Sequence, residues 1–126
     1  MFSAVKTQPA RISDWLQYEE DELGRYSRDI VTLAPNQTLA SGTPLSVGTG
    51  TGMVAYDNAT TGATVATAIL VDAVVVGATA VKAAAIVRHA KVAKDGLSWK
   101  STVDGTGKTA GMADLATLGI IDTPLV

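Results

Sequence analysis

The sequence contains no cysteine and one histidine in 126 residues, and aromatic side chains make up only 5% of it. Without a thiol, a disulfide framework and a thiolate metal site are both excluded. Hydrophobic residues nevertheless account for 47% of the chain, a fraction that excludes a disordered protein. We therefore expect one folded domain whose core is filled by small aliphatic side chains. A short domain without disulfides or cofactors is also a candidate for self-association.

Charge is scarce in the middle of the chain. Residues 30–81 hold only Asp57 and Asp72, whereas residues 1–29 hold four cationic and six anionic side chains. A solvated monomer normally has a surface rich in charge. Two explanations remain open. The middle of the chain is either a β-surface covered by Thr, Ser and Gly, or a surface that meets other subunits, where charge is depleted.

Features of membrane and exported proteins are weak. The apolar run at residues 63–87 is long enough to cross a bilayer, but Asp72 near its centre costs roughly 2.5–3.5 kcal/mol there. The β-branched residues of this run favour a sheet. Residues 1–17 contain no uninterrupted apolar region of the kind found in a signal peptide. We therefore expect a soluble protein without a membrane partner.

Residues 1–26 are interpreted as a flexible N-terminal arm with neither a strand nor an amphipathic helix. Five of their side chains are costly to leave in water: Phe2, Trp15, Leu16, Tyr18 and Tyr26. A polar segment with such side chains is typical of a tail that becomes ordered on contacting a partner. The alternative is that Trp15, Leu16 and Tyr18 pack back on their own domain, which we place at residues 27–126.

The domain at residues 27–126 is predicted to be mainly β. Extended segments rich in β-branched residues start at Arg28 and are separated by turns, among them a type I turn at Pro35–Asn36 and a bend at Gly42. Pro44 lacks the N–H that a sheet needs, so we expect its segment at an edge or a bulge.

One short helix is predicted near the C-terminus. Met112, Leu115 and Leu118 recur at intervals of three and define an apolar helix face, with Gly119 in the position of a left-handed cap. The preceding "DGTGKT" is interpreted as a flexible connector. Its "GKT" lacks the first glycine of a phosphate-binding loop, because Thr102 stands at that position.

Candidate catalytic and metal-binding residues are few. His89 lies in "VRHAKVAK", an alternating segment that predicts a strand with His89 at the surface or at an interface. A triad of His89 with Asp95 or Asp104 lacks the motif of a nucleophile elbow. The contiguous carboxylates of residues 19–22 point in different directions and do not converge on a metal. We expect no catalytic, cofactor or metal site, and no enzyme.

The second half of the chain carries a strip of basic residues: Lys82, Arg88, Lys91, Lys94, Lys100 and Lys108. Such a strip is one mark of nucleic-acid binding. However, the sequence pI is about 5.2, and no arginine–aromatic interleaving is present. An acidic partner surface, including the "EEDE" cluster of a neighbouring subunit, is an alternative target. We expect no nucleic-acid partner.

Four segments in order resemble the lambda-type phage head decoration proteins. They are "SRDIVTLAPNQTLASGTPLSVGT" (27–49), "MVAYDNATTGATVATAILVDAV" (53–74), "IVRHAKVAKDGLSW" (86–99) and "LATLGII" (115–121). The chain departs from the family pattern at Asn36, which replaces a glycine, at Pro44, which replaces a valine, and at Thr67, which replaces a glycine. These departures affect local turn geometry.

The resemblance implies a compact, mainly β fold of the β-clip or small barrel-like kind, with short helices. It implies a homotrimer, made in the host cytoplasm, that binds the outer surface of the virion capsid at threefold and quasi-threefold positions. There it stabilises the expanded head against internal DNA pressure, with the major capsid protein as its partner. In the family an N-terminal arm engages the capsid, commonly by adding a strand.

The residues carried over as candidate capsid contacts are Trp15, Leu16, Tyr18, Tyr26, Ser27, Arg28 and Asp29. The last three mark the junction of arm and domain, where Arg28 and Asp29 are expected to pair with each other or across subunits. A second function remains open, that of a small β-rich virion accessory that binds carbohydrate or another surface. It predicts an exposed aromatic platform.

Overall fold

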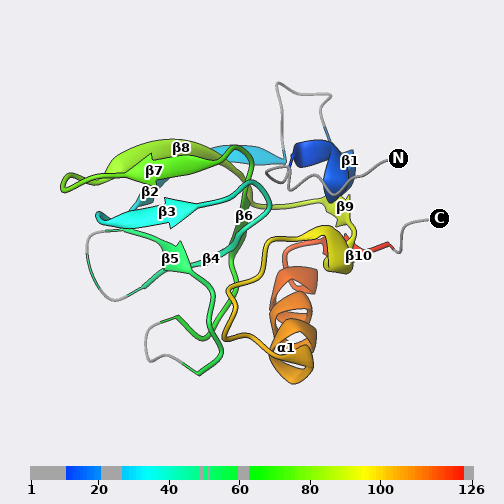
Figure 1. Ribbon diagram of the computed structural model, residues 1–126. Helices are drawn as coiled ribbons and strands as arrows, with labels where there is room; N and C mark the ends of the chain where they lie inside the picture. The colour runs from blue at the N-terminus through cyan, green and yellow to red at the C-terminus, as the bar shows by residue number, and fades with distance from the viewer. Residues whose placement is uncertain (1–10, 21–26, 49, 51, 60–62, 124–126) are drawn as a thin grey trace, which may run out of the picture.

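The computed structural model describes residues 11–20, 27–48, 50, 52–59 and 63–123. These residues form ten strands, one α-helix and two short 3-10 helices (Figure 1). The elements in chain order are η1 (Ile12–Asp14), β1 (Leu16–Glu19), β2 (Arg28–Leu33), β3 (Gln37–Leu39), β4 (Pro44–Ser46), β5 (Val54–Ala55), β6 (Ala68–Leu70), β7 (Val74–Val76), β8 (Val81–Ile86), β9 (Ala90–Val92), η2 (Lys94–Gly96), α1 (Gly105–Ala116) and β10 (Ile120–Asp122). The prediction of a compact, mainly β fold is confirmed. Within the described ranges, no helix is long and apolar enough to cross a membrane.

The largest sheet has five antiparallel strands in the order β2-β8-β6-β4-β5. Its two outer strands meet at one end, where Leu33 of β2 forms a bridge with Met53, the residue before β5. The Met53 N–H donates to the Thr32 carbonyl at 2.8 Å, and the Ala34 N–H donates to the Met53 carbonyl at 3.0 Å. The bridge closes the sheet at this end, so it forms a small barrel.

Gly52 permits this closure. A Cβ atom at position 52 would lie 2.6 Å from the Ala34 nitrogen and 2.8 Å from the Leu33 carbonyl carbon. Both are backbone atoms that are held in the closing bridge, so they have little room to move. The barrel therefore requires a residue without a side chain at this point.

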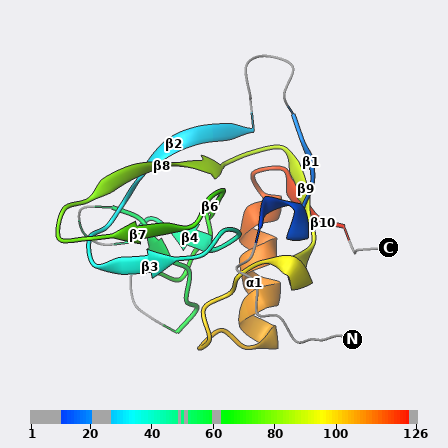
Figure 2. The same ribbon diagram turned by 45° about the horizontal axis from the view of Figure 1, so that its top comes forward.

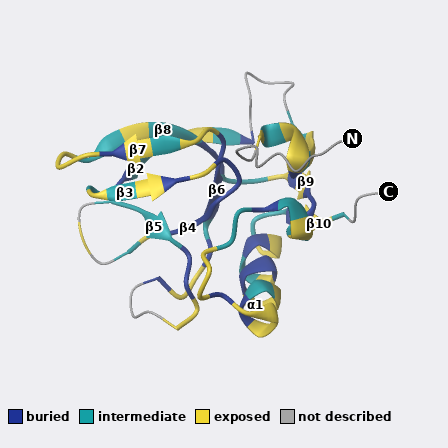
Figure 3. Ribbon diagram, in the orientation of Figure 1, coloured by how far each residue is buried: buried dark blue, intermediate teal, exposed yellow. Residues whose placement is uncertain are grey.

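The central strands of the barrel sheet are buried on both faces. In β6, Ala68 and Leu70 belong to the cluster inside the barrel, whereas Ile69 between them belongs to the cluster outside it. All three are buried, and Figure 3 shows β6 as the buried centre of the molecule. A strand that is buried on both faces has no polar alternation. This explains why β6, within the apolar run at residues 63–87, has no polar residue.

Two smaller sheets complete the fold. The β3–β7 pair packs Leu39, Val74 and Val76 against the inner cluster of the barrel. On the outside lies a layer that consists of α1 and a sheet in the order β1-β9-β10, in which β10 runs parallel to β9 (Figure 2). The first and the last described strands of the chain therefore lie in this outer layer.

The helix starts earlier than the sequence predicts. α1 begins at Gly105, and the Asp104 carboxylate caps it by accepting the Gly107 N–H at 2.8 Å. The interpretation of "DGTGKT" as a flexible connector is therefore wrong, because the cap fixes these residues as the first turn. Gly119 has a φ of 82°, as its predicted cap position requires.

Two local predictions about the first strands are also wrong. Asn36 has a φ of 64°, which does not fit the type I turn that we expected there. Asparagine tolerates this left-handed conformation more readily than most other residues do. Pro44 lies in β4 between β6 and β5 rather than at an edge, and the strand accommodates it as its first residue.

Candidate interaction surfaces

Trp15 attaches the N-terminal segment to the domain. Its side chain is 0% exposed, and its Nε1–H donates to the Ser41 hydroxyl at 3.1 Å. Its backbone carbonyl accepts the Ala93 N–H at 2.7 Å, and β1 follows directly. The expectation that residues 1–26 contain no strand is therefore wrong, because burial of the indole brings the next residues alongside β9. For Trp15 the structure shows the alternative, packing on its own domain.

A glycine makes the seat for the indole. Gly42 has a φ of 84°, and a Cβ atom there would lie 2.7 Å from both Cδ1 and Nε1 of Trp15. The predicted bend at Gly42 is thus present, and it makes room for the Trp15 indole. It lets the backbone approach the face of a large side chain that comes from far away in the sequence.

Ser27, the residue before β2, is held in place by hydrogen bonds to two other segments. It is fully buried, its hydroxyl donates to the His89 carbonyl at 2.7 Å, and the same hydroxyl accepts the Glu20 N–H at 2.6 Å. The Ser27 N–H donates to the Glu20 carbonyl at 3.1 Å. These bonds hold together the two ends of the segment 21–26, which lies outside the described residues together with the candidate Tyr26 and residues 1–10.

The charged pair at the start of β2 has partners in the same chain. Arg28 donates from Nε and Nη2 to the two carboxylate oxygens of Glu19, each at 2.7 Å. Asp29 forms an ion pair with Arg88 at 3.6 Å and accepts the Ile30 N–H at 2.8 Å. The expected pairing of Arg28 with Asp29 is not what the structure shows, because neighbouring residues of a strand point to opposite faces.

The two remaining candidates lie on β1. Leu16 is half-buried and packs against the outer cluster. Tyr18 is 50% exposed, with its hydroxyl 3.4 Å from a carboxylate oxygen of Glu20. Among the described candidates, Tyr18 and Asp29 are therefore the exposed side chains, whereas Trp15 and Ser27 are internal.

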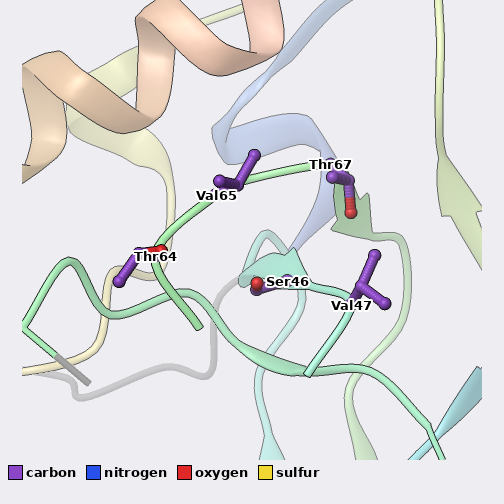
Figure 4. Close-up of a pocket in the computed structure, with 5 residues that line it drawn as sticks. All are labelled: Ser46, Val47, Thr64, Val65 and Thr67. Carbon is purple, nitrogen blue, oxygen red and sulfur yellow. The ribbon is translucent and has the colours of Figure 1, made fainter. Parts of the chain in front are cut away.

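A shallow hollow lies on the barrel (Figure 4). Ser46 and Val47 at the end of β4 line one part of it, and Thr64, Val65 and Thr67, which lead into β6, line the other. Its volume is about 240 Å³. All five lining side chains are uncharged, and both valines are exposed. Such a lining offers no acid, base or nucleophile beyond hydroxyls, so the hollow is suited to contact rather than to catalysis.

The polar groups near α1 satisfy one another. The buried Asp57 carboxylate accepts the Thr102 hydroxyl at 3.0 Å and pairs with Lys100 at 3.2 Å. The Tyr56 hydroxyl donates to the Gly107 carbonyl at 2.8 Å. Burial raises the pKa of this tyrosine above its usual value, and the carboxylates of Asp114, Asp57 and Asp104 add to the shift.

The "GKT" segment belongs to this internal network. The Gly107 N–H is bonded to Asp104 and its carbonyl accepts from Tyr56, so the segment does not form a phosphate cradle. His89 is exposed and has a φ of 49° in the link between β8 and β9, not within a strand as predicted. In the described part of the chain, no three metal-binding side chains come together.

The fold is a small barrel with an outer layer, and the buried polar side chains of the described residues have hydrogen-bond partners. The sequence matches the family described as bacteriophage lambda head decoration protein D over residues 5–120. Because the match covers most of the chain, the protein belongs to this family of phage head decoration proteins, as the resemblance indicated. No individual curated protein matches the sequence.

Proposed function

We propose that the protein is a cement protein that binds the exterior of the expanded head as homotrimers at threefold and quasi-threefold positions. Membership of the decoration family supports the phage capsid as its partner. A protein that binds only the expanded shell stabilises that state by mass action. In this way it would oppose the internal pressure of the packaged DNA.

The observation that supports the trimer is the scarcity of charge on residues 30–81, which form much of the barrel. Of the two charged residues between positions 30 and 81, Asp57 is buried and paired, which leaves Asp72. Val47, Val65 and Val75 are exposed on the same part of the chain, at 63%, 52% and 77%. A second subunit can cover such a surface without desolvating charge. This favours the subunit-contact explanation of the bare middle segment.

The arm at residues 1–26 is proposed to bind the major capsid protein. Within it, residues 1–10 and the exposed Tyr18 are the proposed contacts, whereas Trp15 and Leu16 fasten the arm to the domain. Ser27 and Arg28 fix the junction. An arm that adds a strand gains affinity from its backbone. The three arms of a trimer bind at high effective concentration once one is engaged.

The test is co-sedimentation of the purified protein with expanded, undecorated capsids and, in parallel, with unexpanded shells. We expect saturable binding to the expanded form alone, in multiples of three copies per site. A chain without residues 1–10 is expected to fold and to form trimers but to lose this binding. The deletion stops at residue 10 because a longer one removes Trp15 and β1 from the core. Normal binding of the shortened chain would contradict the role of the arm.

The alternative of a carbohydrate-binding module gains no support from the aromatic residues. Trp15 is buried, and Trp99 is half-buried with its ring edge-on to Tyr56 at 6.0 Å between centroids. The described residues thus present no tryptophan platform on which a sugar ring could stack.

A further inference from the structure

Three side chains form a row across the outer face of the β1-β9-β10 sheet. Lys91 in the central strand pairs with Tyr18 of β1 on one side and with Ile121 of β10 on the other. Residues directly opposite in neighbouring strands project from the same face of a sheet. Tyr18 is 50% exposed, Ile121 is 45% exposed, and Lys91 is exposed between them. The row is therefore a continuous strip on the surface.

The composition of the row is unusual for a face turned to water. On the inner face of the same sheet, Ala90, Val92 and Ile120 are buried in the outer cluster, so the outer face should be polar. Instead, an aromatic ring and an isoleucine flank a single lysine. The stem of a lysine is itself apolar. Most of the surface of the row is therefore apolar, with one positive charge at its centre.

Among the residues that the structure describes, no carboxylate forms an ion pair with Lys91. Its ammonium lies 6.0 Å from the centroid of the Tyr18 ring. The carboxylates of the two flanking strands have other partners: Glu19 of β1 binds Arg28, and Asp122 of β10 accepts the Lys94 N–H at 3.0 Å. By contrast, Arg88 and Lys100 of the basic strip each pair within the chain.

The row Tyr18–Lys91–Ile121 lies where the arm joins the domain. Residues 1–10 lead into Arg11, then η1, then β1, whose Tyr18 is one end of the row. A partner that holds the arm is therefore next to this face. A specific interface buries about 800 Å² on each partner, more than three side chains supply. The row thus fits as the rigid part of a larger contact that includes the arm.

We propose that the row Tyr18–Lys91–Ile121 docks on the capsid shell beside the arm, against a shell surface that offers an apolar strip and a carboxylate opposite Lys91. This inference rests on the proposed function. The arm supplies affinity through its backbone, and the row fixes the orientation of the domain on the shell. The carboxylate gives the contact a salt dependence that backbone pairing lacks.

The experiment measures binding of full-length variants to expanded, undecorated capsids by co-sedimentation. Lys91→Glu reverses the central charge, and the double variant Tyr18→Ser/Ile121→Ser removes the apolar flanks. Lys108→Glu is the matched control, because it makes the same charge change at a partly exposed position of α1, outside both the row and the barrel surface proposed as the trimer contact. We expect at least a tenfold weaker half-saturation for the first two proteins, wild-type binding for the control, and unchanged unfolding midpoints for all three.

The outcomes separate the two proposals. If the wild-type protein fails to bind expanded shells, the proposed cement function itself is wrong. If the wild-type protein binds and Lys91→Glu binds equally well, the arm acts without the row and the inference is overturned. If Lys91→Glu instead dissociates the oligomer in sedimentation velocity without shells, the row is a subunit contact, which also overturns it.

Discussion

The barrel and its outer layer are held together by different kinds of side chain. Among the described residues, the cluster inside the barrel consists of Leu, Val and Ala, with no aromatic ring. The outer cluster is built around Trp15, Tyr56 and Trp99. An ion pair links the two regions, because Arg28 of β2 in the barrel binds Glu19 of β1 in the outer layer. The barrel thus depends on backbone closure and the outer layer on a few large anchors, so single changes should affect the two regions in different ways.

The largest effect is expected from removing the main anchor of the outer layer. Trp15→Ala deletes a fully buried side chain and leaves the Ser41 hydroxyl without its donor, so the free energy of unfolding should fall by about 3–5 kcal/mol. Chemical denaturation measures the change. Tyr18→Ala is the control three residues away, with an expected change below about 0.5 kcal/mol. Equal stability of both variants would show that the segment before β1 does not contribute to the core.

A smaller effect is expected from disturbing the closure of the barrel. Gly52→Ala places a Cβ against the Leu33–Ala34 backbone, so the strands must shift at a cost of roughly 1–3 kcal/mol. Gly77→Ala is the matched control, because a Cβ there meets no atom within 4 Å. Thermal unfolding of the two variants gives the comparison. If Gly52→Ala is as stable as the control, the bridge between the outer strands adds nothing.

The ion pair between the regions is expected to contribute less. The side chains of Arg28 and Glu19 are each only 20% exposed, and their contact is bidentate. We expect a coupling free energy of about 1 kcal/mol in a double-mutant cycle of Arg28→Gln and Glu19→Gln. Arg28→Lys should recover only part of it, because an ammonium cannot make the forked contact. A coupling of zero would place this pair with ordinary surface ion pairs.

An effect of similar size at neutral pH concerns Tyr56. Tyr56→Phe loses the hydroxyl that donates to the Gly107 carbonyl, at a cost of about 1 kcal/mol. Because the pKa of Tyr56 is raised in the folded protein, the folded state holds this proton more tightly than the unfolded state. Its contribution is therefore present below the usual tyrosine pKa of about 10 and is lost as pH rises above it.

Ultraviolet absorbance measures the titration of the tyrosines, and denaturation at several alkaline pH values measures the stability. One tyrosine of the folded protein should ionise later than a free tyrosine does, and Tyr56→Phe should abolish that late phase. The stability of the variant should also fall less steeply with pH. An unchanged late phase in Tyr56→Phe would assign it to another tyrosine.

Much of the barrel could be predicted from local sequence, because its strands are short and β-branched and its bend at Gly42 needs a glycine. The outer layer was harder to predict. The Trp15 indole packs against Ser41 and Gly42, which are far away in the sequence, so nothing around Trp15 indicates whether it is buried. The start of α1 was missed because Gly105 and Gly107 are poor helix formers and hide the cap at Asp104.

The candidate site was predictable only in part. Family resemblance directs attention to residues 15–29, but it does not separate internal residues such as Ser27 from exposed ones such as Tyr18. Nor does any local pattern place Lys91 between Tyr18 and Ile121, since this row depends on strands that are distant along the chain. The register of the sheet, not the identity of the residues, brings the row together.

The meeting of the two outer strands at Leu33 and Met53 has a consequence for crowding. An open sheet edge is a template on which a neighbouring chain can add a strand. In the barrel, the bridge covers the end of β2, and the Asp29 carboxylate occupies the Ile30 N–H further along the same strand. At these points the barrel sheet is therefore a poor template for a strand of a neighbouring copy, even where copies of the protein are crowded together.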